Sequence, residues 1–173
     1  MSSHTLSVLV ENKPGVLARV AGLFARRGFN INSLAVGPTE RPGVSRITVV
    51  VDVEQLPLEQ VTKQLNKLIN VLKVIELEGP EGSVQRDLLL VKVKTPPESR
   101  SAVTQLVDLF RAHVVDVAAE TMVIEATGTE SKLAAMLTLL EPHGVVELVK
   151  SGTVGISRGS KAMSERANKK SSN

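Results

Sequence analysis

The residues best suited to chemistry lie where a predicted strand gives way to a helix, at Asn12, Gly15, Val16 and Leu17. The first turn of a helix carries backbone N–H groups without partners inside the helix, and a partial positive charge. A small anion such as a carboxylate binds well there. Gly15 lets a ligand approach the backbone closely, and the Asn12 amide offers a donor and an acceptor. The apolar neighbours favour a small aliphatic amino acid.

The same stretch also has a purely structural interpretation. Asn is a common residue at the start of a helix, where its side chain caps a free N–H group. Pro suits the first helical turn. The pattern therefore predicts that Asn12 caps the helix and that Pro14 lies in its first turn. From spacing alone, a ligand site and a simple helix cap both remain open.

The length of this helix raises a question about Asn30, which follows it. Residues 14–27 would span roughly 20 Å at 1.5 Å per residue. Asn30 therefore lies far from Asn12 in the same chain. If Asn30 contacts a ligand held at Asn12, it must come from a second chain, and a two-fold axis would then create two equal sites. Ligand binding would be coupled to the dimer interface.

The first half of the chain predicts the element order β-α-β-β-α-β. Residues 4–11 alternate apolar and polar, as in a strand with one buried face. Apolar side chains then recur at helical spacing, and Gly28 suits a left-handed helix end. The remaining elements are predicted as strands at 31–36 and 45–52, a helix opened by Pro57, and a strand at 71–77.

The second half repeats this order. It predicts strands at 87–94, 114–117, 121–127 and 145–149, a helix at 98–112, a helix capped by Thr129, and a further edge strand within 151–159. The fold class is thus α+β, with two tandem ferredoxin-like (βαββαβ) domains at 4–79 and 84–158. In such a domain both helices cover one face of the sheet, so the other face needs a cover, expected from a second copy or another domain.

Charge and composition exclude several classes of protein. Of the net charge of +3, residues 158–173 carry +4, so the basic character belongs to the end of the chain. We expect residues 159–173 to be a basic, flexible tail. Aromatic residues make up 2% of the chain, too few for stacking on single-stranded nucleic acid. Apolar runs stay short of about 18 residues, and no secretory signal pattern is present. We expect a cytoplasmic protein that binds neither membranes nor nucleic acid.

Residues for catalysis are missing. The chain has no Cys, and its three His residues are scattered without metal-ligand spacing. It contains no dinucleotide fingerprint, phosphate loop or nucleophile arrangement. The sequence therefore predicts no catalytic site, no metal site and no cofactor bound by this chain.

Several motifs in order resemble the regulatory (small) subunits of acetohydroxyacid synthase, also called acetolactate synthase. They are residues 6–12 (LSVLVEN), 14–19 (PGVLAR), 27–34 (RGFNINSL), 45–49 (SRITV), 64–69 (QLNKLI), 109–111 (LFR), 115–117 (VDV), and the Ser-Gly and Ser-Arg-Gly groups of 151–159. The resemblance covers about residues 4–160. The first half resembles an ACT domain, the amino-acid-binding form of the ferredoxin-like fold.

This resemblance implies a non-catalytic regulatory partner. Members of the family activate a catalytic large subunit and confer feedback inhibition by valine or a related branched-chain amino acid. Thiamine diphosphate, Mg and FAD are expected on that large subunit. The resemblance further implies a homodimer through the ACT domain, with the effector bound by Asn12, Gly15, Val16 and Leu17 of one chain, and by Asn30 and Ile31 of the other. Pro14 removes one N–H group, so contacts to a carboxylate would begin at Gly15.

The sequence disfavours two other classes of function. A free-standing ACT-type sensor could act on another enzyme or on transcription, but control of transcription would need a basic DNA-reading helix, which neither half supplies. An enzyme in its own right would need the catalytic groups that are missing. The sequence therefore favours a regulatory subunit.

Overall fold

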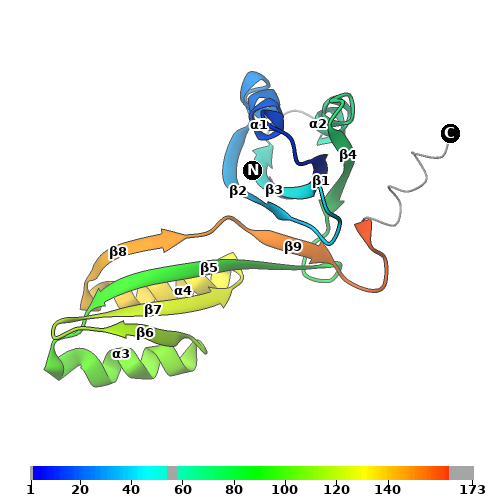
Figure 1. Ribbon diagram of the computed structural model, residues 1–173. Helices are drawn as coiled ribbons and strands as arrows, with labels where there is room; N and C mark the ends of the chain where they lie inside the picture. The colour runs from blue at the N-terminus through cyan, green and yellow to red at the C-terminus, as the bar shows by residue number, and fades with distance from the viewer. Residues whose placement is uncertain (1, 54–57, 164–173) are drawn as a thin grey trace. The chain divides into compact units, whose positions relative to one another are not determined.

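The computed structural model describes residues 2–53 and 58–163. The described chain divides into two compact units: the first comprises the residues up to Val84 together with residues 153–163, and the second comprises Gln85–Gly152 (Figure 1). The first unit is thus built from both ends of the chain.

The elements follow the predicted order in both halves. The first is β1 (Ser2–Glu11), α1 (Val16–Arg26), β2 (Asn30–Pro38), β3 (Val44–Val53), α2 (Leu58–Asn66) and β4 (Val71–Leu77). The second is β5 (Ser83–Lys94), α3 (Pro97–Leu109), β6 (His113–Val117), β7 (Thr121–Gly128), α4 (Glu130–Leu140), a 3-10 turn (Glu141–His143) and β8 (Val145–Lys150), followed by β9 (Val154–Ser157). The prediction that Pro57 opens the second helix lies outside the described residues.

The first unit has an antiparallel sheet of order β2-β3-β1-β4, with α1 and α2 on one face (Figure 1). Alternate strand residues and one side of each helix form its core, as their apolar spacing predicts. The fully buried members are Leu6, Val8, Val20, Phe24, Ile47, Val49, Val51, Val61 and Leu65. The ferredoxin-like α+β prediction is confirmed for this unit.

The end of α1 is fixed by Gly28, which adopts a left-handed conformation with φ 73°. The N–H of Phe29 donates to the carbonyl of Phe24 at 3.1 Å, and the N–H of Gly28 donates to that of Ala25 at 3.1 Å. These bonds belong to a Schellman-type helix end, which requires a residue that accepts positive φ. The predicted role of Gly28 is confirmed, and it places Asn30 directly at the start of β2.

The other face of this sheet is covered by the C-terminal strap, our name for residues 153–163. The strap includes β9, which lies on the side of the sheet away from α1 and α2 (Figure 1). It hydrogen-bonds to a side chain from each of the four strands. The bonds are Thr153 N–H to Ser33 Oγ (2.7 Å), Arg46 Nη1–H to the Gly155 carbonyl (3.2 Å), Ser7 Oγ–H to Met163 Sδ (3.5 Å) and Lys73 Nζ–H to the Met163 carbonyl (3.5 Å).

The strap differs from the sequence-based expectation in three ways. The cover of the sheet comes from the same chain, whereas a second copy or another domain was expected. Residues 153–158 group with the first unit, although the second domain was predicted to reach residue 158. Met163 is only 8% exposed, so the start of the predicted flexible tail is part of the fold. The prediction for residues 164–173 lies outside the described residues.

The second unit repeats the architecture with an antiparallel sheet of order β6-β7-β5-β8. Helices α3 and α4 pack against it around a core that includes Leu89, Val91, Val93, Val103, Ile124, Leu133, Met136 and Leu140. The side chain of Thr129 accepts a hydrogen bond from the N–H of Lys132 at 3.3 Å, which confirms Thr129 as the cap of α4. Two ferredoxin-like domains in tandem are therefore present.

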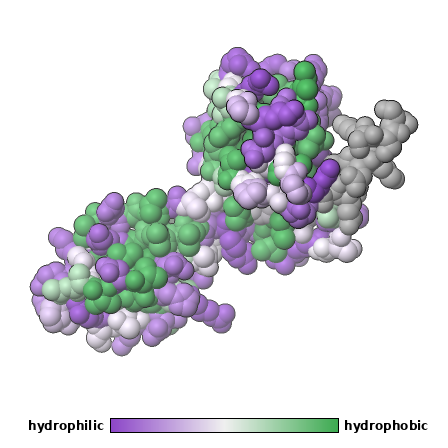
Figure 2. Space-filling view, viewed as in Figure 1, coloured by the Kyte–Doolittle hydropathy of each residue, from purple (hydrophilic) through white to green (hydrophobic). Residues whose placement is uncertain are grey.

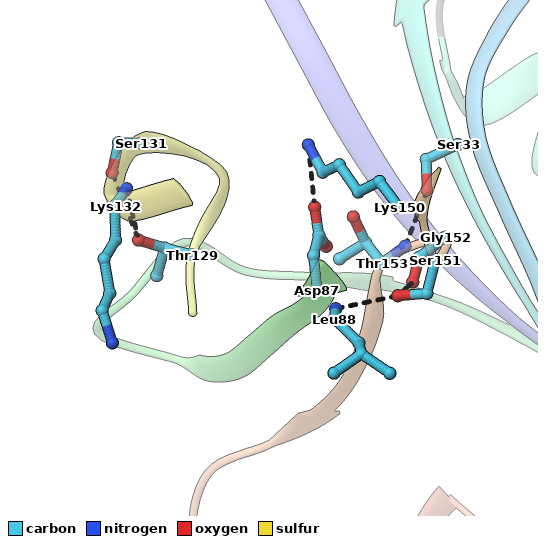
Figure 3. Close-up of polar contacts among 10 residues, drawn as sticks. All are labelled: Ser33, Asp87, Leu88, Thr129, Ser131, Lys132, Lys150, Ser151, Gly152 and Thr153. Atoms are coloured by element: carbon cyan, nitrogen blue, oxygen red, sulfur yellow. Dashed lines mark hydrogen bonds and ion pairs between the residues drawn. The ribbon is translucent and has the colours of Figure 1, made fainter. Parts of the chain in front are cut away.

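An ion pair in the second unit joins Lys150, at the end of β8, to Asp87 on β5 at 3.2 Å (Figure 3). The Asp87 side chain is 5% exposed and that of Lys150 is 34% exposed. A buried carboxylate is costly unless a partner compensates its charge. Lys150 therefore stabilises the pairing of β8 with β5.

We expect Lys150→Met to lower the free energy of unfolding of the second unit by about 1–3 kcal/mol, because it leaves the Asp87 carboxylate buried without its cation. Urea unfolding followed by circular dichroism measures the loss. Lys63→Met is the matched control, since the Lys63–Glu59 pair is exposed, and such pairs contribute under about 0.5 kcal/mol. Equal effects of the two substitutions would contradict the assignment.

Candidate functional site

The segment between β1 and α1 is a tight turn built by Pro14 and Gly15. Gly15 has φ 85° and ψ −9°, and the Val16 N–H lies 3.4 Å from the Lys13 carbonyl. These values match the third residue of a type II turn, with Pro favoured just before it. Only Gly adopts this conformation without strain. A Cβ atom at Gly15 would meet no heavy atom within 4 Å, so the space above the turn is open.

The turn corrects the predicted role of Asn12. The cap residue of α1 is Gly15, no side chain caps the helix, and Pro14 lies before the helix and outside its first turn. The Asn12 N–H instead donates to the Gly43 carbonyl at 2.9 Å, which ties the turn to the β2–β3 hairpin. Within the described part of the chain, the Asn12 side chain makes no hydrogen bond and is exposed. Its amide is thus available to a ligand.

Several backbone N–H groups at this helix start are unpaired. Arg19 is the first residue whose N–H donates in the α-helical pattern, to the Gly15 carbonyl at 3.1 Å. Among residues 2–53 and 58–163, the N–H groups of Gly15, Leu17 and Ala18 have no acceptor. The Val16 side chain is 3% exposed and belongs to the core, so only its backbone faces the turn. Ala18 was missed in the sequence because its side chain carries no polar group.

At the opposite end of α1, Asn30 and Ile31 begin β2. The Asn30 amide Nδ2–H donates to Asn32 Oδ1 at 2.7 Å, and Asn30 is exposed. Ile31 is half-buried against the core. A register shift follows, so that Ile31 lies opposite Val51 and Ser33 opposite Val50, with Asn32 as the extra residue. This is the geometry of a β-bulge, which often re-aims side chains at functional sites.

The two ends of α1 cannot form one site within a chain. Eleven helical residues span about 16 Å. The predicted residues therefore fall into two groups: Asn12, Gly15, Val16 and Leu17 at one end, Asn30 and Ile31 at the other.

Strand β2 is an edge strand, paired only with β3 in the sheet of the first unit. It bears the apolar side chains of Leu34 and Val36, which are 37% and 49% exposed, and Leu17 on α1 is 41% exposed. Figure 2 shows apolar surface on the side of this unit where Figure 1 draws β2 and α1. An uncharged, exposed edge is open to pairing with another strand.

The described residues form neither a metal site nor a membrane-spanning helix. Among the described residues, no three His, Asp or Glu side chains come close enough together to hold a metal ion. The longest described helix, α3, has 13 residues, and no helix in this part of the chain is long and apolar enough to span a membrane.

Comparisons with known proteins agree with these observations. A family model described as the AHAS small subunit-like ACT domain matches residues 6–73, and one described as the small subunit of acetolactate synthase matches residues 86–159. The chain is 60% identical to the acetolactate synthase small subunit of Mycolicibacterium smegmatis over 157 residues, covering 91% of this chain and 92% of that protein.

More distant relatives extend the match. The chain is 53% identical to a probable acetolactate synthase small subunit of Archaeoglobus fulgidus, covering 91% of this chain and 98% of that protein. The crystal structure of the acetolactate synthase small subunit from Thermotoga maritima superposes with a TM-score of 0.86 at 42% identity, covering 93% of this chain and all of that one. The chain therefore belongs to the family of acetolactate synthase small subunits, with an ACT domain in its N-terminal half.

Proposed function

We propose that this small subunit activates a thiamine-diphosphate-dependent catalytic subunit, which carries the cofactors Mg and FAD as well, and makes it sensitive to feedback inhibition by valine. The observation that carries the proposal is the turn before α1, which leaves the N–H groups of Gly15, Leu17 and Ala18 unpaired beside open space. A carboxylate can accept from several such groups at once, and the helix start favours its negative charge.

The rest of the effector fits the same place. The exposed Asn12 amide is positioned to meet the carboxylate or the ammonium group of an amino acid. Leu17 offers apolar surface to a short branched side chain. Lys13 is paired with Glu11 at 2.8 Å, so backbone groups supply most of the anion contacts. Binding by backbone groups suits a small ligand of fixed shape.

The second half of the site comes from a neighbouring copy. If two chains pair along β2, their α1 helices run antiparallel, and the start of one helix lies beside the end of the other. Asn30 and Ile31 of the neighbour then approach Asn12 and Gly15. Because two chains share each site, valine binding is linked to the strength and geometry of the homodimer interface.

Reconstitution tests this proposal. The chain is mixed with its cognate catalytic subunit, and acetolactate formation is assayed over a range of valine concentrations. We expect the rate to rise on adding the small subunit and to fall again as valine is added. A rate that the small subunit does not change, and that valine does not lower, would reject the proposal.

A further inference from the structure

The hydrogen bond between Ser33 and Thr153 joins the C-terminal strap to the strand that carries Asn30 and Ile31. The Thr153 N–H donates to Ser33 Oγ at 2.7 Å, and both residues are half-buried (Figure 3). A bond of this length, partly shielded from water, is well formed. The bond fixes the start of the strap against the edge strand β2.

Ser33 occupies a sensitive position on that strand. It is the first residue after the bulge at Asn32, and Ile31 lies just before that bulge. Within the sheet, β2 is hydrogen-bonded only to β3, so its backbone is restrained on one side. A bulge also removes regular pairing at the extra residue. The bond from Thr153 therefore adds a restraint at the point where the sheet restrains β2 least.

The strap is itself firmly held. The N–H of Arg158 donates to the Gly82 carbonyl at 2.8 Å, and its Nε–H donates to the Pro80 carbonyl at 2.8 Å. Arg46 bonds the carbonyl of Gly155, and Met163 is buried at the far end. Thr153 is thus the first residue of a well-anchored segment, and its bond to Ser33 restrains β2.

The chain on the other side of Thr153 is anchored as well. In the second unit, the N–H of Ser151 donates to the Leu88 carbonyl, and Ser151 Oγ accepts from the Leu88 N–H, each at 2.9 Å (Figure 3). Along the chain, only Gly152 separates Ser151 from Thr153. The connection between Thr153 and the anchored residue Ser151 is therefore a single residue long.

From these contacts we infer that Ser33 is a positioning residue: its bond to Thr153 sets the place of Asn30 and Ile31 and links effector binding to the strap. The inference rests on the proposed function, because it assigns Ser33 to the regulation of that same site. Coupling of this kind is reciprocal. If the bond strengthens valine binding by some factor, valine strengthens the bond by the same factor.

The first test compares variants in the reconstituted enzyme. We expect Ser33→Ala to raise the half-inhibitory valine concentration about fivefold, the worth of one ordinary hydrogen bond, with activation in the absence of valine unchanged. Ser33→Thr keeps the acceptor oxygen and should restore the wild-type value. Thr153→Ala keeps the backbone N–H and should behave as wild type. A loss of activation together with inhibition, not rescued by Thr, would show a merely structural role and overturn the inference.

The second test measures the strap directly by amide hydrogen exchange of the peptide that contains Thr153. In the wild-type chain we expect valine to slow this exchange by about fivefold, the same factor by which Ser33→Ala raises the half-inhibitory valine concentration. In Ser33→Ala we expect valine to leave the exchange rate unchanged. If the wild type is inhibited by valine while Ser33→Ala is inhibited equally and exchange is unaltered, the inference fails and the proposed function stands. If valine does not inhibit the enzyme reconstituted with the wild-type chain, both the inference and the proposed function are rejected.

Discussion

Replacing Gly15 with Asp is expected to abolish inhibition by valine while leaving activation of the catalytic subunit in place. The new carboxylate would stand in the open space above the turn, where the carboxylate of the effector is proposed to bind. Two like charges about 4 Å apart near a protein surface repel by about 4 kcal/mol. The half-inhibitory valine concentration should therefore rise by about a hundredfold or more in the reconstituted enzyme.

Two controls separate charge from backbone strain. Gly15→Asn has nearly the same size and tolerates positive φ equally well, but it is neutral, so we expect a rise of about tenfold or less. Gly159→Asp introduces the same charge at a glycine that also has φ 85° and open surroundings, and valine inhibition should persist. Unaltered inhibition of Gly15→Asp would place the effector elsewhere.

The second large effect is expected from Val36→Asp on the edge strand β2. Val36 is 49% exposed in the single chain, and the proposed pairing of two chains buries it. A carboxylate buried without a partner costs several kcal/mol, so the dimer should dissociate. Valine inhibition should be lost with it, because Asn30 and Ile31 of the neighbour would leave the site. Sedimentation at several protein concentrations and the valine titration measure the two effects.

Val115→Asp is the matched control for the dimer. Val115 lies on β6, the edge strand of the second unit, and is 52% exposed. The same charge is introduced at a similar exposed edge position, and the chain should remain dimeric and valine-sensitive. Dissociation of Val115→Asp with retention of the Val36→Asp dimer would assign the interface to β6 and contradict the proposed site.

The regular elements could be predicted because each turns one apolar face toward the core between its sheet and its helices. The alternation in β1 and the spacing of Val20 and Phe24 in α1 report directly on contact with the core. Gly28 and Thr129 were recognisable because helix ends need residues with special backbone or capping properties. At these positions the residues close by in the sequence were sufficient to predict the local structure.

The strand of the strap was predicted within residues 151–159 and is confirmed as β9, but its place over the sheet of the first unit was not predicted. Strand β9 turns Val154 and Ile156 outward, 55% and 59% exposed, and buries Gly155. Apolar spacing therefore gives no sign of the sheet beneath it. Two of its contacts join its backbone to the side chains of Ser33 and Arg46, which lie more than 100 residues earlier in the chain. Periodicity describes side chains and is insensitive to bonds made by the backbone.

The helix start was predicted at the right place but with the wrong local geometry. Asn, Pro and Gly before a helix are consistent with two structures. In one, Asn caps the first helical turn; in the other, a separate β-turn precedes the helix, which then begins later in the chain. Here the type II turn at Pro14 and Gly15 is formed, and α1 begins at Val16. Asn12 therefore does not cap the helix, and its side chain is left exposed.

The division of the first unit between the two ends of the chain has a consequence for biosynthesis. On the ribosome, β1 to β4 are complete once Leu77 has emerged, but the strap begins only at Thr153. Synthesis of the intervening residues 78–152 takes about 4–15 s at roughly 5–20 residues per second. During that time the sheet face with Leu9 and Val50 lacks its cover. The contiguous second unit can fold first, whereas the ACT domain completes its fold only after the strap has been synthesised.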